Sequence, residues 1–117
     1  METNNSTISI NKFILGQGTE GIYSDITIEI KKSGQAKVNR GQDIQLNDEK
    51  ILKAIENEFE KNWINGYKKY GINLEITILN VGVDASGRKY AIENSVNGVM
   101  HDALPKIGVN PPQIFGL

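Results

Sequence analysis

Apolar and polar residues alternate in three stretches of the chain, and this pattern predicts three strands of a sheet. The clearest alternation runs from Tyr23 to Ile30, where isoleucine occupies every second position of the latter part. Successive side chains of a strand point to opposite faces of its sheet, so this strand is predicted to bury one face. Residues 8–15 and 72–83 show the same period, and the range 72–83 is predicted to lie centrally in the sheet.

A helix is predicted after the short polar segment that ends at Asn47 or Asp48. Either residue can cap a helix, and apolar residues then recur at spacings of three and four, at Ile51, Leu52, Ile55 and Phe59. The helix is expected to run to about Asn65, with Gly66 just past its end as a stop signal.

A second helix is predicted beyond residues 84–87, which offer candidate caps. Its apolar stripe contains Tyr90 or Ala91, Ile92, Val96, Val99 or Met100, and Ala103. The helix is expected to end before Pro105, because proline breaks the hydrogen-bonding pattern. The following tail, residues 106–117, carries two further prolines and favours an extended chain that could add a short strand at the sheet edge.

The order of these elements predicts an α+β fold. Residues 35–40 fit a short edge strand, so the order becomes strand, strand, short strand, helix, strand, helix, tail. This order suits a small antiparallel or mixed sheet with two helices on one face. Residues 1–7 are predicted to be a flexible leader, and residues 8–117 a single domain.

Composition restricts the partners that the chain can have. Thirteen basic and 14 acidic residues give a formal net charge of −1, so no broad cationic field exists and any contact with nucleic acid must be local. The chain has no cysteine and therefore no thiolate metal site or disulfide. No apolar run is long enough to span a membrane, and a cytoplasmic location without membrane partners is expected.

Residues that could perform catalysis are few and isolated. His101 is the sole histidine and lies near the end of a predicted helix, where the helix dipole favours it without any function. Asp84 follows a strand and precedes a helix, so a capping role is favoured over a catalytic one. Trp63, Tyr67 and Tyr70 lie beside lysines and could stack on bases, but closing the corner between helix and strand is the favoured interpretation. We therefore predict no catalytic residues, no metal site and no cofactor.

The segment from Gly16 to Gly21 loosely matches the GxGxxG pattern of dinucleotide-binding loops. A strand of alternating isoleucines follows it, whereas a phosphate site needs the N-terminus of a helix at that point. A hairpin loop is therefore the better interpretation, and this chain alone is not expected to bind a nucleotide.

The same hairpin carries a resemblance to a known family. Residues 12–30, KFILGQGTEGIYSDITIEI, are similar without a gap to KFIRQSGGRGQYGHVVIEI, which opens the fourth domain of translation elongation factor G. Gly66-Tyr67 looks like that domain's AGY turn, and Val83 to Ser86 resembles its VDSS segment. The proline-containing tail falls where the family has a PVLLEP ending, so the similarity covers about the whole chain in order.

This resemblance implies a fold and a mode of action. The implied fold is that of the second domain of small-subunit ribosomal protein S-five, with a left-handed βαβ crossover that general rules would not predict. In the full factor, two tip loops of this domain touch messenger and transfer RNA. The matching contact residues here are Gln17, Gly18, Glu20 and Gly21 in one loop, and Gly82, Asp84 and Ser86 in the other.

The sequence departs from the family at both loops. Two arginines of the family's first tip loop fall at Leu15 and Glu20, and the second loop is one residue shorter and lacks a histidine. Three hypotheses follow. The leading one is a non-enzymatic domain that binds the ribosome or RNA; the others are a protein-interaction or regulatory domain that has kept the fold, and a small enzyme using His101 or Asp84.

Overall fold

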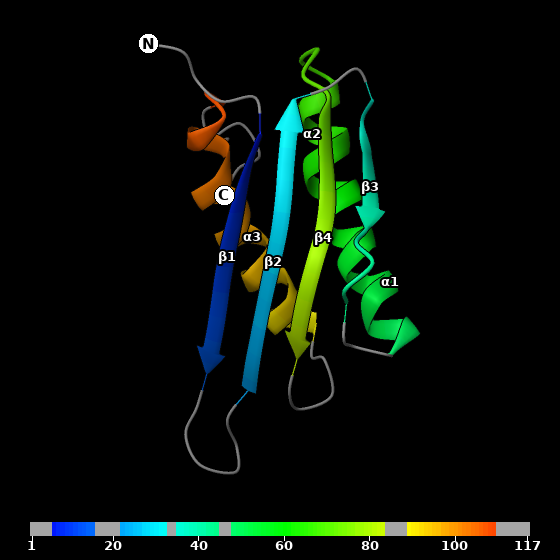
Figure 1. Ribbon diagram of the computed structural model, residues 1–117, viewed down its shortest axis with the longest axis vertical. Coiled ribbons are helices and arrows are strands. Elements are labelled where there is room, and N and C mark those ends of the chain that lie inside the picture. The colour runs from blue at the N-terminus through cyan, green and yellow to red at the C-terminus, as the bar shows by residue number, and fades with distance from the viewer. Residues whose placement is uncertain (1–5, 16–21, 33–34, 45–47, 84–88, 110–117) are drawn as a thin grey trace.

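Four strands form one mixed sheet, and two helical segments cover one face of it. The computed structural model describes residues 6–15, 22–32, 35–44, 48–83 and 89–109. The strands lie in the order β1-β2-β4-β3, with β1–β2 and β2–β4 antiparallel and β3–β4 parallel (Figure 1). Their bounds are Ser6–Leu15 (β1), Ile22–Lys32 (β2), Lys37–Arg40 (β3) and Leu74–Val83 (β4).

This arrangement confirms the predicted α+β class and the position of each strand. The short strand β3 lies at an edge, and β4 lies between β2 and β3. β1 begins at Ser6, two residues before the predicted start, because β2 extends to Lys32 and offers ladder partners to Ser6 and Thr7. Residues 1–5 of the predicted leader and residues 110–117 of the predicted tail lie outside the described ranges.

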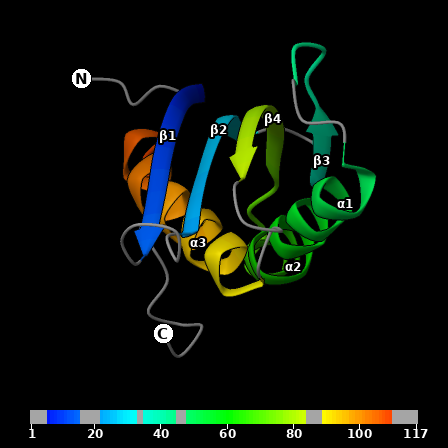
Figure 2. The same ribbon diagram turned by 90° about the horizontal axis from the view of Figure 1, so that it is seen from below.

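One face of the sheet is covered by two helical segments that lie side by side (Figure 2). The first comprises α1 (Glu49–Glu58), a π-helical turn η2 (Phe59–Ile64) and α2 (Asn65–Lys68), which follow one another without a break. The second is α3 (Lys89–Lys106), which packs on β1 and β2. The predicted cap is confirmed for α1, since Oδ1 of Asp48 accepts hydrogen bonds from the amides of Lys50 and Ile51 at 3.0 and 3.3 Å.

The connection from β3 to β4 is a left-handed crossover. In Figure 1 the helices lie behind the sheet; the chain descends β3, climbs through α1, η2 and α2, and descends β4 to the left of β3. Seen from the helix side with these strands pointing up, β4 lies to the left of β3. A βαβ unit whose second strand lies to the left in this view is left-handed. Nearly all such connections are right-handed. The crossover implied by the resemblance is therefore present.

The core lies between the sheet and the helices, on the side that the alternation predicted. Ile26, Ile28 and Ile30 of β2 are completely buried. They pack with Leu74, Ile76 and Ile78 of β4, with Leu52, Ile55, Phe59, Trp63, Ile64 and Tyr67 of the first helical segment, and with Ile92, Val96, Val99, Met100, Ala103 and Leu104 of α3. Both predicted apolar helix stripes are thus confirmed, apart from Tyr90 and Ala91, whose side chains lie outside the described part.

A β-bulge at Leu79 interrupts the alternation in β4. Thr27 pairs with Asn80 and Ile28 with Ile78, so Leu79 has no opposite residue on β2. Beside it, the amide of Gly41 donates a 2.7 Å hydrogen bond to the carbonyl of Ile78. A Cβ on Gly41 would lie 2.8 Å from that carbonyl oxygen, so the close approach requires glycine.

Two predicted helix ends are wrong, and both helices continue further. Gly66 lies inside α2 and is buried, whereas Gly71 adopts φ +77° and ends the helix. Its amide bonds the carbonyl of Lys68 and the amide of Ile72 bonds that of Tyr67, both at 3.1 Å, in a Schellman motif. The end of α3 repeats this motif at Gly108, also with φ +77°, so Pro105 lies within the last helical turn.

Candidate functional site

The two predicted tip loops are attached to the same end of the sheet. Leu15, the last residue of β1, pairs with Ile22, the first of β2. Val83, the last residue of β4, pairs with Ser24. The segments that follow Leu15 and Val83 therefore leave the sheet next to each other, at the lower end in Figure 1, which we call the loop end. Among the predicted contact residues, the described one is Gly82; Gln17, Gly18, Glu20, Gly21, Asp84 and Ser86 lie outside the described ranges.

Gly82 has a packing role that the sequence did not reveal. It pairs with Asp25 across the β2–β4 ladder, and a Cβ on Gly82 would lie 3.0 Å from Oδ1 of Asp25. The carboxylate of Asp25 therefore lies over the bare backbone of Gly82. Sequence reasoning missed Asp25; the one available signal was its place in the polar phase of the strand, opposite to that of Ile26.

The described part of the loop end carries charges of both signs. Asp25 of β2 pairs with Lys12 of β1 in the ladder. Asp48 and Glu49 at the start of α1 are followed by Lys50, and α3 begins with Lys89. These charges largely balance, so this surface does not provide the net electrostatic attraction on which most nucleic-acid binding depends.

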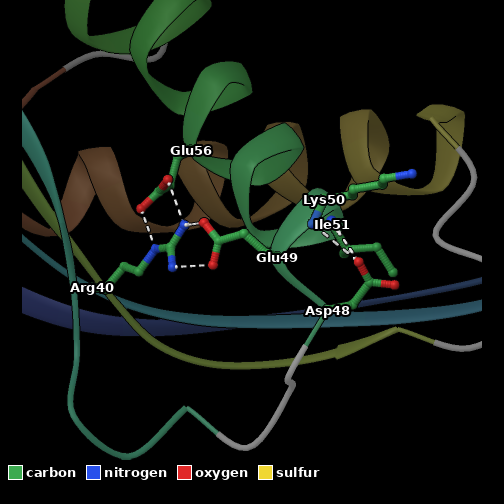
Figure 3. Close-up of polar contacts among 6 residues, drawn as sticks. All are labelled: Arg40, Asp48, Glu49, Lys50, Ile51 and Glu56. Atoms are coloured by element: carbon green, nitrogen blue, oxygen red, sulfur yellow. Dashed lines mark hydrogen bonds and ion pairs between the residues drawn. The ribbon is translucent and has the colours of Figure 1, made fainter.

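The arginine at the end of the edge strand is held by two carboxylates. Arg40, the last residue of β3, donates to both oxygens of Glu49 at 2.9 and 2.7 Å and to both oxygens of Glu56 at 2.6 and 3.0 Å (Figure 3). These bonds lower the pKa of Glu49 below its ordinary value. Arg40 thus ties the edge strand to α1, and its donors face carboxylates of the chain itself.

The aromatic residues near the end of the first helical segment divide into two kinds. Trp63 and Tyr67 are 2% and 3% exposed and belong to the core, which confirms the predicted corner-closing role for these two. Burial raises the pKa of Tyr67 to about 12. Tyr70 is 59% exposed and does not close the corner.

His101 packs against the core instead of joining a reactive cluster. Its ring meets Trp63 edge to face, with centroids 5.8 Å apart. Across the described residues, no group of three His, Asp, Glu or Cys side chains is arranged to hold a metal ion. The geometry therefore gives His101 a structural contact with a core ring.

A shallow groove of about 550 Å³ separates the two helical segments on the outer side of the molecule. Its walls carry two lysines, two glutamates and four asparagines, which are Lys61, Lys69, Glu58, Glu93, Asn62, Asn65, Asn94 and Asn97. Opposite charges balance along it, and Asn62 already donates to Glu58. The groove therefore selects neither an anion nor a cation by charge.

Comparison with known proteins supports the fold and indicates no function. The chain matches no protein-family model and no curated protein. It is similar to the crystal structure of a Thermus thermophilus protein whose given name carries no function, with a TM-score of 0.67 and 11% sequence identity. The match covers 91% of this chain and 16% of the Thermus chain, so the shared fold is one part of a much longer protein there.

These observations define the class of the protein as a compact α+β domain with a mixed sheet and helices on one face. Within the described ranges, no helix is both long and apolar enough to cross a membrane.

Proposed function

We propose that this chain is a non-enzymatic domain of the translation-factor kind, which associates with the ribosome or its RNA through the loop end. The observation that carries the proposal is the left-handed β3–β4 crossover combined with two loop segments at one end of the sheet. Crossovers of this hand are rare, so their occurrence together with the ordered resemblance to elongation factor G favours a common architecture over coincidence.

The contact surface consists of the segments that follow Leu15 and Val83, with Gly82 supporting the second. The family's arginine positions are occupied by Leu15 and Glu20. Most of the binding free energy of this interface must therefore come from shape complementarity and from contacts of main-chain groups. The interaction is accordingly weak and local, and a cytoplasmic location goes with it.

A single substitution tests this proposal by restoring a positive charge that the family has in the first tip loop and this chain lacks. Glu20→Arg restores the family's residue at its matching position. Co-sedimentation with ribosomes and with isolated subunits across a salt series is expected to show binding about three- to tenfold tighter than wild type at low salt, with a steeper salt dependence. The matched control is Glu60→Arg, which makes the same charge change on an exposed position of η2 and is expected to leave binding unchanged.

Equal gains from both variants would show that net charge alone governs binding, and would contradict a contact at the loop end. A wild-type protein that fails to pellet with ribosomes at low salt, and a Glu20→Arg variant that also fails, would contradict the proposal outright.

The second function is a protein-interaction domain that has kept the fold, and the net charge of −1 favours it. The family's two arginine positions are occupied by Leu15 and Glu20, a change that weakens contact with a phosphate backbone more than contact with a protein surface. In this case Glu20→Arg weakens binding to the protein partner, so the same variant separates the two functions by the sign of its effect.

A further inference from the structure

The end of the molecule opposite to the loop end carries a concentration of lysines. Lys31 and Lys32 end β2, Lys37 begins β3, and Lys68 and Lys69 lie at the end of α2; all five are exposed. Lys32 pairs with Leu74, the first residue of β4, and the turn after α2 leads directly into β4. These termini therefore meet at one end of the sheet, the upper end in Figure 1, which we call the lysine pole.

One carboxylate orders part of the lysine pole without neutralising it. The Nζ atoms of Lys31 and Lys37 lie 3.9 and 4.0 Å from the carboxylate oxygens of Glu75, whose side chain is 17% exposed. Asn39 also donates to Glu75 at 2.8 Å. A single glutamate thus lies near two ammonium groups and leaves both lysine side chains about half exposed.

The surplus of positive charge is unusual for this chain. Five of its 13 basic residues gather at the lysine pole although the whole chain has a net charge of −1. The nearby end of α3 adds no charge of either sign, because Lys106 pairs with Asp102 at 3.0 Å. The lysine pole is therefore a local concentration of positive charge that the net charge of the chain conceals.

An exposed aromatic ring completes this surface. Tyr70 follows Lys68 and Lys69 directly, and among the described residues it is the large hydrophobic side chain that is exposed, at 59%. The cations in the last helical turn are favoured by the helix dipole. The helix dipole does not explain the exposed ring of Tyr70 or the lysines on β2 and β3. An exposed ring among ammonium groups has the chemistry of a base-stacking platform beside a phosphate track.

We infer that the lysine pole binds single-stranded RNA, with phosphates between the lysines and a base stacked on Tyr70. A lipid surface fits less well, since the pole offers one ring and no apolar face to insert. Recognition is independent of sequence, because neither charge nor stacking distinguishes the bases. This surface is separate from the loop end and does not require it.

Fluorescence anisotropy with a labelled 12-nucleotide oligouridine tests this inference at 25–200 mM salt. Lys68→Gln combined with Lys69→Gln is expected to weaken binding about tenfold at low salt and to reduce the salt slope by about one to two. The matched control is Lys50→Gln combined with Lys53→Gln on α1, which removes the same charge from exposed positions elsewhere and is expected to change binding less than twofold.

Two substitutions of Tyr70 separate stacking from general anion binding. Tyr70→Phe keeps the ring and is expected to bind as wild type, whereas Tyr70→Ala is expected to lose about five- to a hundredfold in affinity. Circular dichroism and thermal melting confirm that each variant is folded. The inference is overturned if wild type does not bind at 25 mM salt, if the α1 control loses as much as the pole variant, or if Tyr70→Ala binds as wild type. Binding to anionic vesicles without binding to oligouridine also overturns it.

The proposed function and this inference fail separately. Loss of ribosome binding in the lysine pole variant, with no effect of Glu20→Arg, supports the pole and contradicts the loop end. Tighter ribosome binding by Glu20→Arg, with no effect of the lysine pole variant, supports the loop end and contradicts the pole as a site of ribosome binding.

Discussion

At the scale of single residues, two glycines allow neighbouring strands to approach closely. Gly41 meets the backbone of β4 at the Leu79 bulge, and Gly82 lies under the carboxylate of Asp25. The two sites differ in what would have to move. A methyl group on Gly82 meets a side chain that can rotate, whereas one on Gly41 meets a carbonyl fixed in the sheet.

Gly41→Ala is therefore expected to destabilise the fold by roughly 1–3 kcal/mol, the usual cost of overpacking. Urea denaturation gives the free energy of unfolding, and Gln42→Ala at the neighbouring exposed position is expected to stay within about 0.5 kcal/mol of wild type. A Gly41→Ala protein as stable as wild type would show that β3 can move away from β4 at no cost.

At the same scale, the core residues were predictable and the contact partners were not. Period-two isoleucines identified the buried face of β2 because a half-buried strand leaves that signature in any sequence. The pairing of Asp25 with Gly82 depends on the register between strands far apart in the sequence. No local pattern encodes that register, so the loop-end geometry could be known only from the fold.

At the scale of elements, the helix ends show where local signals are ambiguous. Gly66 was the predicted stop, and tertiary packing overrides that local signal. Gly66 is buried in the helix, while Gly71 takes the left-handed conformation of the Schellman motif. The π-helical turn η2 was not predicted either. It places Phe59, Trp63 and Ile64 in the core together, which regular helical spacing does not anticipate.

Tyr67, which anchors the end of α2 in the core, gives the fold an alkaline pH dependence. Its folded pKa of about 12 lies above the ordinary value of about 10. The unfolded chain then releases the phenolic proton more readily, so this contribution to stability is complete below pH 10 and is lost as pH rises toward 12.

Urea midpoints measured from pH 8 to 12 are expected to fall more steeply for wild type than for Tyr67→Phe between pH 10 and 12. Tyr70→Phe removes an exposed hydroxyl instead and should keep the wild-type slope. Parallel curves for wild type and Tyr67→Phe would mean that the buried phenol titrates as it does in the unfolded chain.

At the scale of the whole molecule, the hand of the crossover marks the limit of general rules. The order of elements predicted the fold class, but the connection rule alone favours a right-handed β3–β4 unit. The left hand was accessible only through the resemblance to elongation factor G. The concentration of lysines at the end opposite to the loop end was hidden by a net charge near zero.

The central claim, that the loop end faces ribosomal RNA, can be tested by directed hydroxyl-radical cleavage. The chain contains no cysteine, so Glu20→Cys and the control Lys53→Cys on α1 each offer a single attachment point for an iron chelate. The account predicts localised cuts in ribosomal RNA from position 20 and background cleavage from position 53. Background cleavage from both positions, in complexes shown to be bound, would contradict it.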